Sequence, residues 1–337
     1  MGNGQTMENT KKLSAVFLDL GSLDNDDLDL SDLQGCLSGL TTHTHVREED
    51  VVQLAANAEV LICNKVPVRR YCIEQLPNLK LICVCATGVN NIDLEAARER
   101  GIQVSNVRSY ATPSVVQHAF MLILNLLTSF RDYQTAITNQ AWQRAQQFCL
   151  LDYPINELAG KTLGIVGFGE LGKGMVEPAK AFGMRILVAE RAGREAARTG
   201  RVKFESVLQQ SDVLTLHCPL TPSTRDLIGA KELAMMKSEA ILINVARGGV
   251  VDEAALLQAL HERKIAGAGI DVLSVEPPAQ GNPLLECDLP NLIVTPHIAW
   301  ASRQARQRLV QEMARNIRDF SVGKARNAVL PDLSEPL

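Results

Sequence analysis

The most informative part of this sequence is the stretch Gly164-Ile165-Val166-Gly167-Phe168-Gly169-Glu170-Leu171-Gly172. An apolar strand runs into three glycines with the spacing Gly167-x-Gly169-x-x-Gly172, and a helical segment continues to Phe182. The first glycine permits a tight turn, the second lets backbone N–H groups approach a ligand, and the third lets the helix pack closely on the strand. The pattern is typical of a loop that binds the pyrophosphate of a dinucleotide at the beginning of a helix.

The next apolar strand supports this interpretation. It covers residues 186–189 and ends in Glu190, 18 residues after Gly172, close to where such a fold places the group that binds the adenosine ribose. A carboxylate accepts hydrogen bonds from ribose hydroxyls and repels a 2′-phosphate, so we expect NAD as the cofactor. NADP is the alternative, because Arg191 and Arg194 could turn toward a phosphate instead of forming a solvated basic helix start.

Composition limits the classes of protein to consider. With 337 residues, 46% of them hydrophobic, the chain is long enough for two domains that each have a core. A formal net charge of -4 gives no basic surface for nucleic acid, and no apolar run reaches the length of a membrane-spanning helix. Residues 1–12 and 331–337 read as tails without a signal segment, so we expect a soluble cytoplasmic protein. Most of the eight cysteines lie in apolar strands, which indicates reduced thiols, and no cluster of metal ligands occurs.

Two series of apolar strands alternate with helical segments. The strands of the first series are expected at 15–20, 59–63, 80–85 and 102–105, and those of the second at 162–166, 185–189, 213–216, 240–244, 267–271 and 292–295. A last helix, 302–320, is too short for a third domain and is expected to return to the first series.

The predicted fold class is therefore α/β, with a Rossmann-type doubly wound parallel sheet domain inserted into a smaller flavodoxin-like α/β domain. Residues 13–110 and 298–330 are expected to form the substrate (catalytic) domain, and 111–297 the NAD-binding Rossmann domain. The active site would lie in the cleft between the two domains.

A polar segment around Trp142 follows the long apolar helix that begins at Ser114. An aromatic side chain among Gln140, Gln143 and Arg144 needs burial, so we interpret residues 119–158 approximately as a dimerisation arm and expect a homodimer. An exposed loop is the alternative.

Three side chains follow strands of the second series, where open α/β sheets bind their ligands. They are Arg247, Glu276 and His297. A guanidinium can hold the carboxylate of a 2-oxo acid with two hydrogen bonds, and an imidazolium can protonate the carbonyl oxygen as hydride reaches the carbon. A carboxylate beside the imidazole would orient the ring. Each residue alone is also compatible with a purely structural role as a cap, a loop end or a turn, but together they predict reduction of a 2-oxo acid.

Three motifs resemble the signature regions of the D-isomer-specific 2-hydroxyacid dehydrogenase family. They stand at 163–172, at 217–222 with Thr224-Arg225, and at 236–252, and the resemblance extends from about Ala15 to Asp319. It implies that Arg247 binds the substrate carboxylate, that Glu276 pairs with the catalytic histidine, and that His297 is the acid/base.

The same resemblance implies the binding residues. Asp271 would contact the nicotinamide carboxamide, Glu190 the adenosine ribose, and the amides of Glu170 and Leu171 the pyrophosphate. The implied cofactor-binding residues are Gly167, Gly169, Glu170, Leu171, Gly172, Glu190, Cys218, Pro219, Thr224, Val245, Ala246 and Asp271. The implied substrate-binding residues are Lys65, Ala86, Thr87, Gly88 and Arg247.

Within the family, the segments 17–19, 64–67, 86–93 and 295–302 look most like glycerate dehydrogenases, which are also hydroxypyruvate reductases. This implies reduction of hydroxypyruvate and glyoxylate to D-glycerate and glycolate. Val89 and Gln117 depart from the pattern, since these enzymes often carry an aromatic residue and a glutamate there. The alternatives are a D-lactate or phosphoglycerate-type dehydrogenase, or an NAD-sensing corepressor-like binding protein of the same fold. We interpret His118 as a helix-packing histidine.

Overall fold

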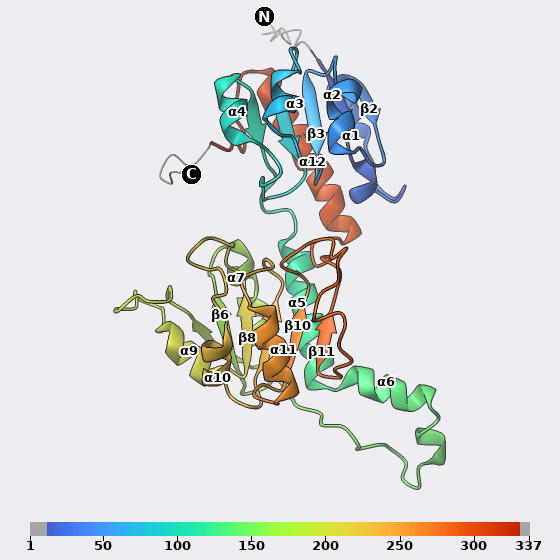
Figure 1. Cartoon of the computed structure of the whole chain (residues 1–337). Helices are drawn as coiled ribbons and strands as arrows, with labels where there is room; N and C mark the ends of the chain where they lie inside the picture. Colours follow the sequence, from blue (N-terminus) through green and yellow to red (C-terminus); the bar gives the residue numbers. More distant parts are fainter. Residues whose placement is uncertain (1–11, 331–337) are drawn as a thin grey trace, which may run out of the picture. The chain divides into compact units, whose positions relative to one another are not determined.

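The computed structural model describes residues 12–330, so most of the two predicted tails lies outside the described residues. The described chain forms two compact units, residues 12–111 with 301–330, and residues 112–300 (Figure 1). The second unit is thus inserted into the sequence of the first. His297 belongs to the second unit, together with Ile298, Ala299 and Trp300.

The first unit contains a five-stranded parallel sheet with the order β2-β1-β3-β4-β5. Its strands are β1 (Leu13–Phe17), β2 (Leu37–Thr42), β3 (Val60–Cys63), β4 (Leu81–Val84) and β5 (Gln103–Ser105). Every residue of β3 and β4 is buried, as expected of parallel strands covered on both faces. The sequence did not predict β2, because this edge strand buries only Leu37 and has Gly39 in its middle.

Short helices cover this sheet, and one long helix also packs in this unit. They are α1 (Ser31–Gly35), α2 (Val51–Leu54), α3 (Arg70–Glu74), α4 (Leu94–Glu99) and α12 (Arg303–Ser321), with 3-10 turns η1 (Leu20–Ser22) and η2 (Glu48–Asp50). The hydroxyl of Ser302 caps α12 by accepting a hydrogen bond from the N–H of Ala305. The helix then buries an apolar stripe of Ala305, Leu309, Val310, Met313 and Ile317.

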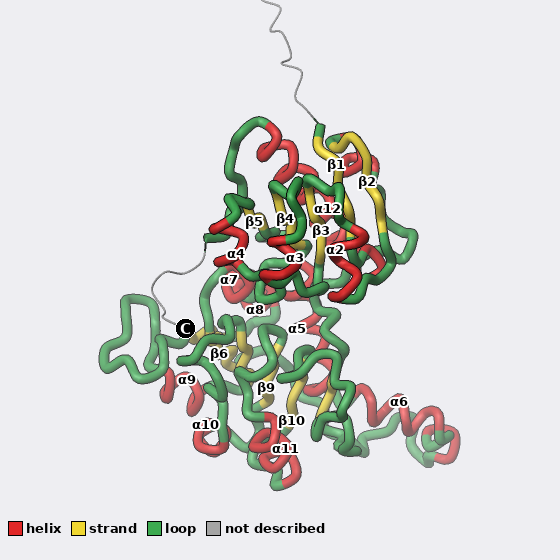
Figure 2. Tube along the Cα trace, turned by 45° about the horizontal axis from the view of Figure 1, so that its top comes forward, coloured by secondary structure: helices red, strands yellow, loops and turns green. Residues whose placement is uncertain are grey.

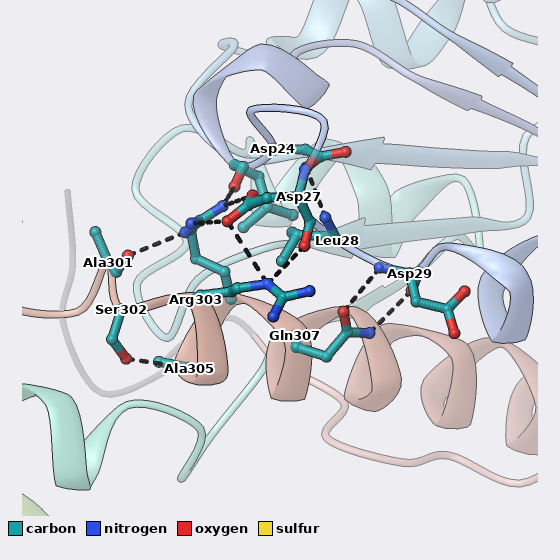
Figure 3. A network of polar contacts seen from close by, with 11 residues as sticks. Asp24, Asp27, Leu28, Asp29, Ala301, Ser302, Arg303, Ala305 and Gln307 are labelled. Carbon is teal, nitrogen blue, oxygen red and sulfur yellow. Dashed lines mark hydrogen bonds and ion pairs between the residues drawn. The ribbon is translucent and has the colours of Figure 1, made fainter.

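Polar contacts fix the beginning of α12 to the loop after η1 (Figure 3). Arg306 binds both carboxylate oxygens of Asp27 at 2.7 and 2.8 Å, and this pairing lowers the pKa of Asp27 to about 2. Gln307 exchanges two hydrogen bonds with the backbone of Asp29. These contacts hold the two chain segments of the first unit together.

The second unit contains a six-stranded parallel sheet with the order β11-β10-β9-β8-β6-β7. Its strands are β6 (Thr162–Val166), β7 (Arg185–Val188), β8 (Val213–Leu216), β9 (Ile241–Asn244), β10 (Gly267–Ile270) and β11 (Leu292–Val294). The two parallel α/β sheets confirm the predicted fold class. From β6 the chain first forms β7 on one side and then returns to β8 on the other, so the strand order reverses beside β6. The loop after β6 therefore lies at the point where such sheets bind ligands.

Helices flank the strands of the second unit (Figure 2). They are α5 (Thr112–Leu127), α6 (Phe130–Thr138), α7 (Glu170–Gly174), α8 (Val176–Ala181), α9 (Phe204–Gln210), α10 (Ala230–Met235) and α11 (Glu253–His261), with the 3-10 turn η3 (Trp142–Arg144). The helix predicted after the glycine loop is divided into α7 and α8 at Met175. Pro178 explains the break, since it has no N–H to bond the carbonyl of Gly174.

Helix α6 and the following segment extend away from the sheet of the second unit (Figure 1). This segment, residues 139–157, carries several exposed apolar side chains, among them Trp142, Phe148, Leu151 and Ile155. Within the described residues, no single helix has the length and apolar character to cross a membrane. Helices α5 and α6 pass that test only as a pair bent by 62°. The eight cysteines all lie in the described residues and are free thiols.

Candidate active site

The glycine loop after β6 has the shape that a pyrophosphate requires. Gly167 has φ +90°, and a Cβ there would lie 2.6 Å from the backbone of His217 and Cys218. A Cβ on Gly172 would lie 2.1 Å from the carbonyl oxygen of Gly167. Neither position accepts a side chain, whereas a Cβ on Gly169 would meet no atom within 4 Å. The loop is therefore tightly packed against backbone atoms at Gly167 and Gly172 and open at Gly169. This shape fits the phosphates of a dinucleotide next to the beginning of α7.

Glu190, at the carboxyl end of β7, is 2% exposed and its carboxylate is already paired. Arg198 donates from Nη2 to Oε1 at 2.6 Å and from Nε to Oε2 at 2.7 Å. The backbone N–H groups of Arg191 and Arg198 also donate to these oxygens. These hydrogen bonds, chiefly the two from the Arg198 side chain, hold the pKa of Glu190 well below its usual range. The sequence drew attention to Arg191 and Arg194 but not to Arg198, which lies in an irregular loop without a pattern to mark it.

The segment after β8 combines a buried histidine with a tight turn. Burial lowers the pKa of His217 to about 4, and its Nε2 lies 2.9 Å from the hydroxyl of Thr215. The hydroxyl of Thr224 donates to the carbonyl of Pro219 at 2.6 Å and accepts from the N–H of Thr221 at 2.8 Å. Thr224 thus fixes the turn that presents Cys218 and Pro219, both among the residues expected at the cofactor.

Asn244 shapes the turn after β9. Its Oδ1 accepts from the N–H of Ala246 at 3.1 Å, and its Nδ2 donates to the carbonyl of Arg247 at 3.0 Å. Val245 and Ala246 are buried, whereas Arg247 is exposed and donates from Nη1 to the carbonyl of Ala246. The guanidinium therefore retains further donors for a carboxylate.

Glu276 and His297 meet as the sequence led us to expect. His297 Nδ1 lies 2.6 Å from Glu276 Oε2, and the other carboxylate oxygen accepts from the N–H of Leu273 at 2.8 Å. With Nδ1 held by the carboxylate, Nε2 is the nitrogen that remains for a substrate. The side chains are 30% and 34% exposed, so small molecules can reach the pair. Since β9, β10 and β11 are neighbours, Arg247, Glu276 and His297 follow adjacent strands of the sheet.

Asp271 is 1% exposed and shapes the turn that carries His297. Its carboxylate accepts from the hydroxyl of Thr295 at 2.5 Å and from the N–H groups of Ile298 and Ala299 at 3.0 and 2.8 Å. Its carbonyl accepts from the N–H of His297 at 2.8 Å. His297 has φ +54°, a left-handed conformation that these contacts support.

His118 joins the same network. Its Nε2 lies 2.9 Å from the hydroxyl of Thr295 and 3.4 Å from Oδ1 of Asp271. Burial lowers its pKa, and the neighbouring carboxylate opposes that effect. His118 is therefore more than a packing residue. This contact could not be predicted from the sequence, because His118 is in α5 and its partners Asp271 and Thr295 follow β10 and β11, far along the chain.

The substrate-binding candidates Lys65 and Ala86 to Gly88 lie in the first unit, after β3 and β4. Asp19, which belongs to the resembling segment 17–19 but was not predicted as a site residue, is 3% exposed and fixes the loop after β3. It accepts from the N–H groups of Asn64, Lys65 and Val66 at 2.8, 2.7 and 3.2 Å. Its position two residues after the end of β1 was the available signal.

The second loop is also held by side chains. The hydroxyl of Thr87 donates to the carbonyl of Val107 at 3.0 Å, and Asn106 Nδ2 donates to the carbonyl of Thr87 at 2.7 Å. A cavity of about 610 Å³ lies at the carboxyl ends of the neighbouring strands and is lined by Asp19, Thr44, His45 and Lys65 among others.

Comparison with known proteins agrees with this geometry. Residues 120–299 match the family model described as D-isomer specific 2-hydroxyacid dehydrogenase, NAD binding domain. The chain is 46% identical to the glycerate dehydrogenase of Methylorubrum extorquens, over 95% of this chain and 99% of the relative. It is 36% identical to the hydroxypyruvate reductase of Blautia hydrogenotrophica, over 83% and 88% of the two chains.

Among solved structures, a Thermus thermophilus protein has a TM-score of 0.81 and 31% identity, and the match covers 94% of this chain and 100% of that one. The family match spans the glycine loop, Arg247, Glu276 and His297. This chain belongs to the D-isomer specific 2-hydroxyacid dehydrogenase family, and it is an NAD-dependent enzyme of the glycerate dehydrogenase kind.

Proposed function

We propose that the protein reduces hydroxypyruvate and glyoxylate to D-glycerate and glycolate. The observation that carries the proposal is the 2.6 Å pairing of His297 Nδ1 with Glu276, because it directs Nε2 to the substrate. The names of two relatives, a glycerate dehydrogenase and a hydroxypyruvate reductase, support substrates of this size.

Each residue at the site has a distinct task. Arg247 binds the substrate carboxylate with two hydrogen bonds, and the amides of Ala86 to Gly88 together with Lys65 assist it. His297 Nε2 donates a proton to the carbonyl oxygen, and Glu276 stabilises the imidazolium before that transfer. When bound, the nicotinamide supplies the hydride that the carbonyl carbon accepts. The carbonyl carbon and oxygen thus receive one hydride and one proton, which yields the 2-hydroxy acid.

The cofactor that we expect to be preferred is NADH. The glycine loop from Gly167 to Gly172 would hold the pyrophosphate and Glu190 the adenosine ribose. The remaining contacts are assigned to Cys218, Pro219, Thr224, Val245, Ala246 and Asp271. The role of Asp271 is supported by its place beside the His297 turn.

A homodimer is the assembly that the exposed apolar side chains favour. Phe148 is 89% and Leu151 82% exposed, and Trp142 is 54% exposed although its Nε1 bonds the carbonyl of Phe148. An apolar groove of about 760 Å³ lies along α5, α7 and α8 of the same unit and includes Phe120 and Phe182. Large apolar surfaces of this kind are typical of contacts between subunits. We assign the protein to the cytoplasm, in agreement with its eight free cysteines.

The test is a panel of 2-oxo acids with NADH. Hydroxypyruvate, glyoxylate, pyruvate and 3-phosphohydroxypyruvate are compared by kcat/KM, and the chirality of the product is determined. We expect hydroxypyruvate and glyoxylate to be the best substrates and D-glycerate to be formed. A preference for pyruvate or for the phosphorylated acid would assign the chain to a D-lactate or phosphoglycerate-type enzyme. Cofactor binding without turnover of any 2-oxo acid would indicate an NAD-sensing binding protein.

A further inference from the structure

A loop rich in arginine follows β7 and returns to the sheet beside it. Residues 191–201 leave the sheet after Glu190 and rejoin it at Val202, and the two ends pair directly. The N–H of Glu190 donates to the carbonyl of Val202 at 2.8 Å, and the N–H of Val202 donates to the carbonyl of Val188 at 2.9 Å. The loop is thus fixed at its base, next to the end of β7.

The composition of this loop is strongly cationic. It reads Arg-Ala-Gly-Arg-Glu-Ala-Ala-Arg-Thr-Gly-Arg, with four arginines and one glutamate. Arg201 lies over the ring of Phe168 in the glycine loop, 5.1 Å from the ring centroid, and donates to the carbonyl of Ala189. Its guanidinium therefore links the arginine loop to the loop that is assigned to the pyrophosphate.

Arg198 forms hydrogen bonds with the Glu190 carboxylate, the group that would bind the adenosine ribose. Both oxygens of Glu190 accept from its guanidinium, and each also accepts from a backbone N–H. Four hydrogen bonds are about what a carboxylate can accept, and the Glu190 side chain is only 1% exposed. Hydroxyl groups of a ribose can reach these oxygens only if Arg198 moves away.

The same pairing changes what the site offers to an anion. An unpaired carboxylate repels a phosphate, but the Glu190–Arg198 pair has no net charge. The guanidinium has five N–H donors, and the pairing with Glu190 leaves donors on Nη1 and Nη2. The Arg198 side chain is 49% exposed, and the 51% exposed Arg194 lies 3.9 Å from Glu190. Both cations are therefore accessible to a phosphate.

We propose that Arg198 determines the cofactor specificity of this enzyme by neutralising Glu190 and donating hydrogen bonds to the 2′-phosphate of NADPH. NADH displaces Arg198 from the carboxylate and gains the hydrogen bonds of its ribose hydroxyls to Glu190, whereas NADPH binds with the pair intact and contacts Arg198 through its 2′-phosphate. The enzyme accordingly accepts NADPH as a second cofactor. The inference rests on the proposed placement of the adenosine ribose beside Glu190, and it does not depend on which 2-oxo acid is reduced.

The test is binding of NADH and NADPH in the absence of any 2-oxo acid, followed by the fluorescence of the reduced nicotinamide. Wild type is compared with Arg198→Ala and Arg198→Gln. A charge-assisted hydrogen bond contributes enough that its loss should raise the Kd of NADPH by about 10- to 100-fold. The Kd of NADH should stay the same or fall, because the ribose no longer competes with Arg198.

Lys264→Ala is the matched control. Lys264 forms an exposed ion pair with Glu262 at 2.7 Å in the same unit, so this variant loses one positive charge elsewhere. It should change neither Kd by more than about twofold, as expected of a surface ion pair. Glu190→Gln should free the guanidinium and strengthen NADPH binding relative to NADH.

Three results would overturn the inference. In the first, Arg198→Ala binds NADPH as wild type does; in the second, it loses NADH and NADPH equally; in the third, wild type binds no NADPH. If hydroxypyruvate is not reduced but Arg198→Ala selectively weakens NADPH binding, the proposed substrate is wrong and the specificity role of Arg198 stands.

Discussion

The buried His217 should make the stability of the protein depend on pH between about 7 and 4. The folded state holds this ring neutral, since burial lowers its pKa from 6.5 to about 4. As the pH falls below 6.5, the unfolded chain binds a proton that the folded state does not bind, and stability is lost. The loss is complete once the pH is below the folded-state pKa.

The magnitude follows from the two pKa values. One pKa unit corresponds to about 1.4 kcal/mol, so the full loss approaches about 3 kcal/mol below pH 4 and reaches about 2 kcal/mol at pH 5. His217→Gln removes the titration, and its amide can still reach the hydroxyl of Thr215, which lies 2.9 Å from Nε2 in the wild type.

The assay is urea unfolding of wild type and His217→Gln at pH 7 and pH 5. A difference in absolute stability between the two proteins at pH 7 does not affect the comparison. Between the two pH values, the wild type should lose about 2 kcal/mol more unfolding free energy than the variant. The other histidines, including His118, are present in both proteins, so their contributions to the pH dependence cancel in the comparison. Identical pH dependence in wild type and variant would show that His217 is not held neutral in the folded state.

Three other predictions concern the substrate clamp, the glycine loop and the start of α12. Arg247→Lys keeps the charge but loses the two-pronged geometry, so KM for hydroxypyruvate, glyoxylate and pyruvate should rise and kcat should fall; unchanged steady-state kinetics for all three would place the carboxylate elsewhere. Gly172→Ala forces a Cβ to within 2.1 Å of the Gly167 carbonyl, and thermal unfolding should show a loss of about 1–3 kcal/mol; an unchanged melting curve would contradict this. Asp27→Asn should lower the urea midpoint at pH 7, because the pairing with Arg306 stabilises the fold above pH 3.8 and is lost as the pH falls toward about 2. The difference in midpoint between variant and wild type should therefore shrink on acidification. A difference that stays constant with pH would argue against the pair.

Much of the second unit could be predicted because its strands are short apolar runs with clear ends. The bounds of β6 and β8 equal those predicted from the sequence, and the other four strands of this unit differ from their predicted ranges by one residue at one end. The spacing of Gly167, Gly169 and Gly172 marked the loop because only glycine fits at two of these positions. The pairing of Glu276 with His297 was implied by the family resemblance, and both residues follow strands of the second unit, at the edge where parallel sheets bind ligands.

Other features have no periodic signal in the sequence. The edge strand β2 buries one residue, so its pattern does not differ from that of a loop. Arg198 reaches Glu190 from an irregular loop, and His118 meets Asp271 across the fold from α5. Such contacts depend on side-chain direction and on tertiary packing, which the local composition does not determine.

In the proposed reaction, His297 is oriented by Glu276 and protonates the carbonyl oxygen of a small 2-oxo acid. The most direct test is the turnover of hydroxypyruvate by His297→Ala, with the Kd of NADH measured on the same protein. We expect a turnover lowered by roughly 10² to 10⁴ and nearly unchanged NADH binding, the usual effect of removing a general acid. Near-normal turnover in His297→Ala, with NADH bound as in the wild type, would contradict it.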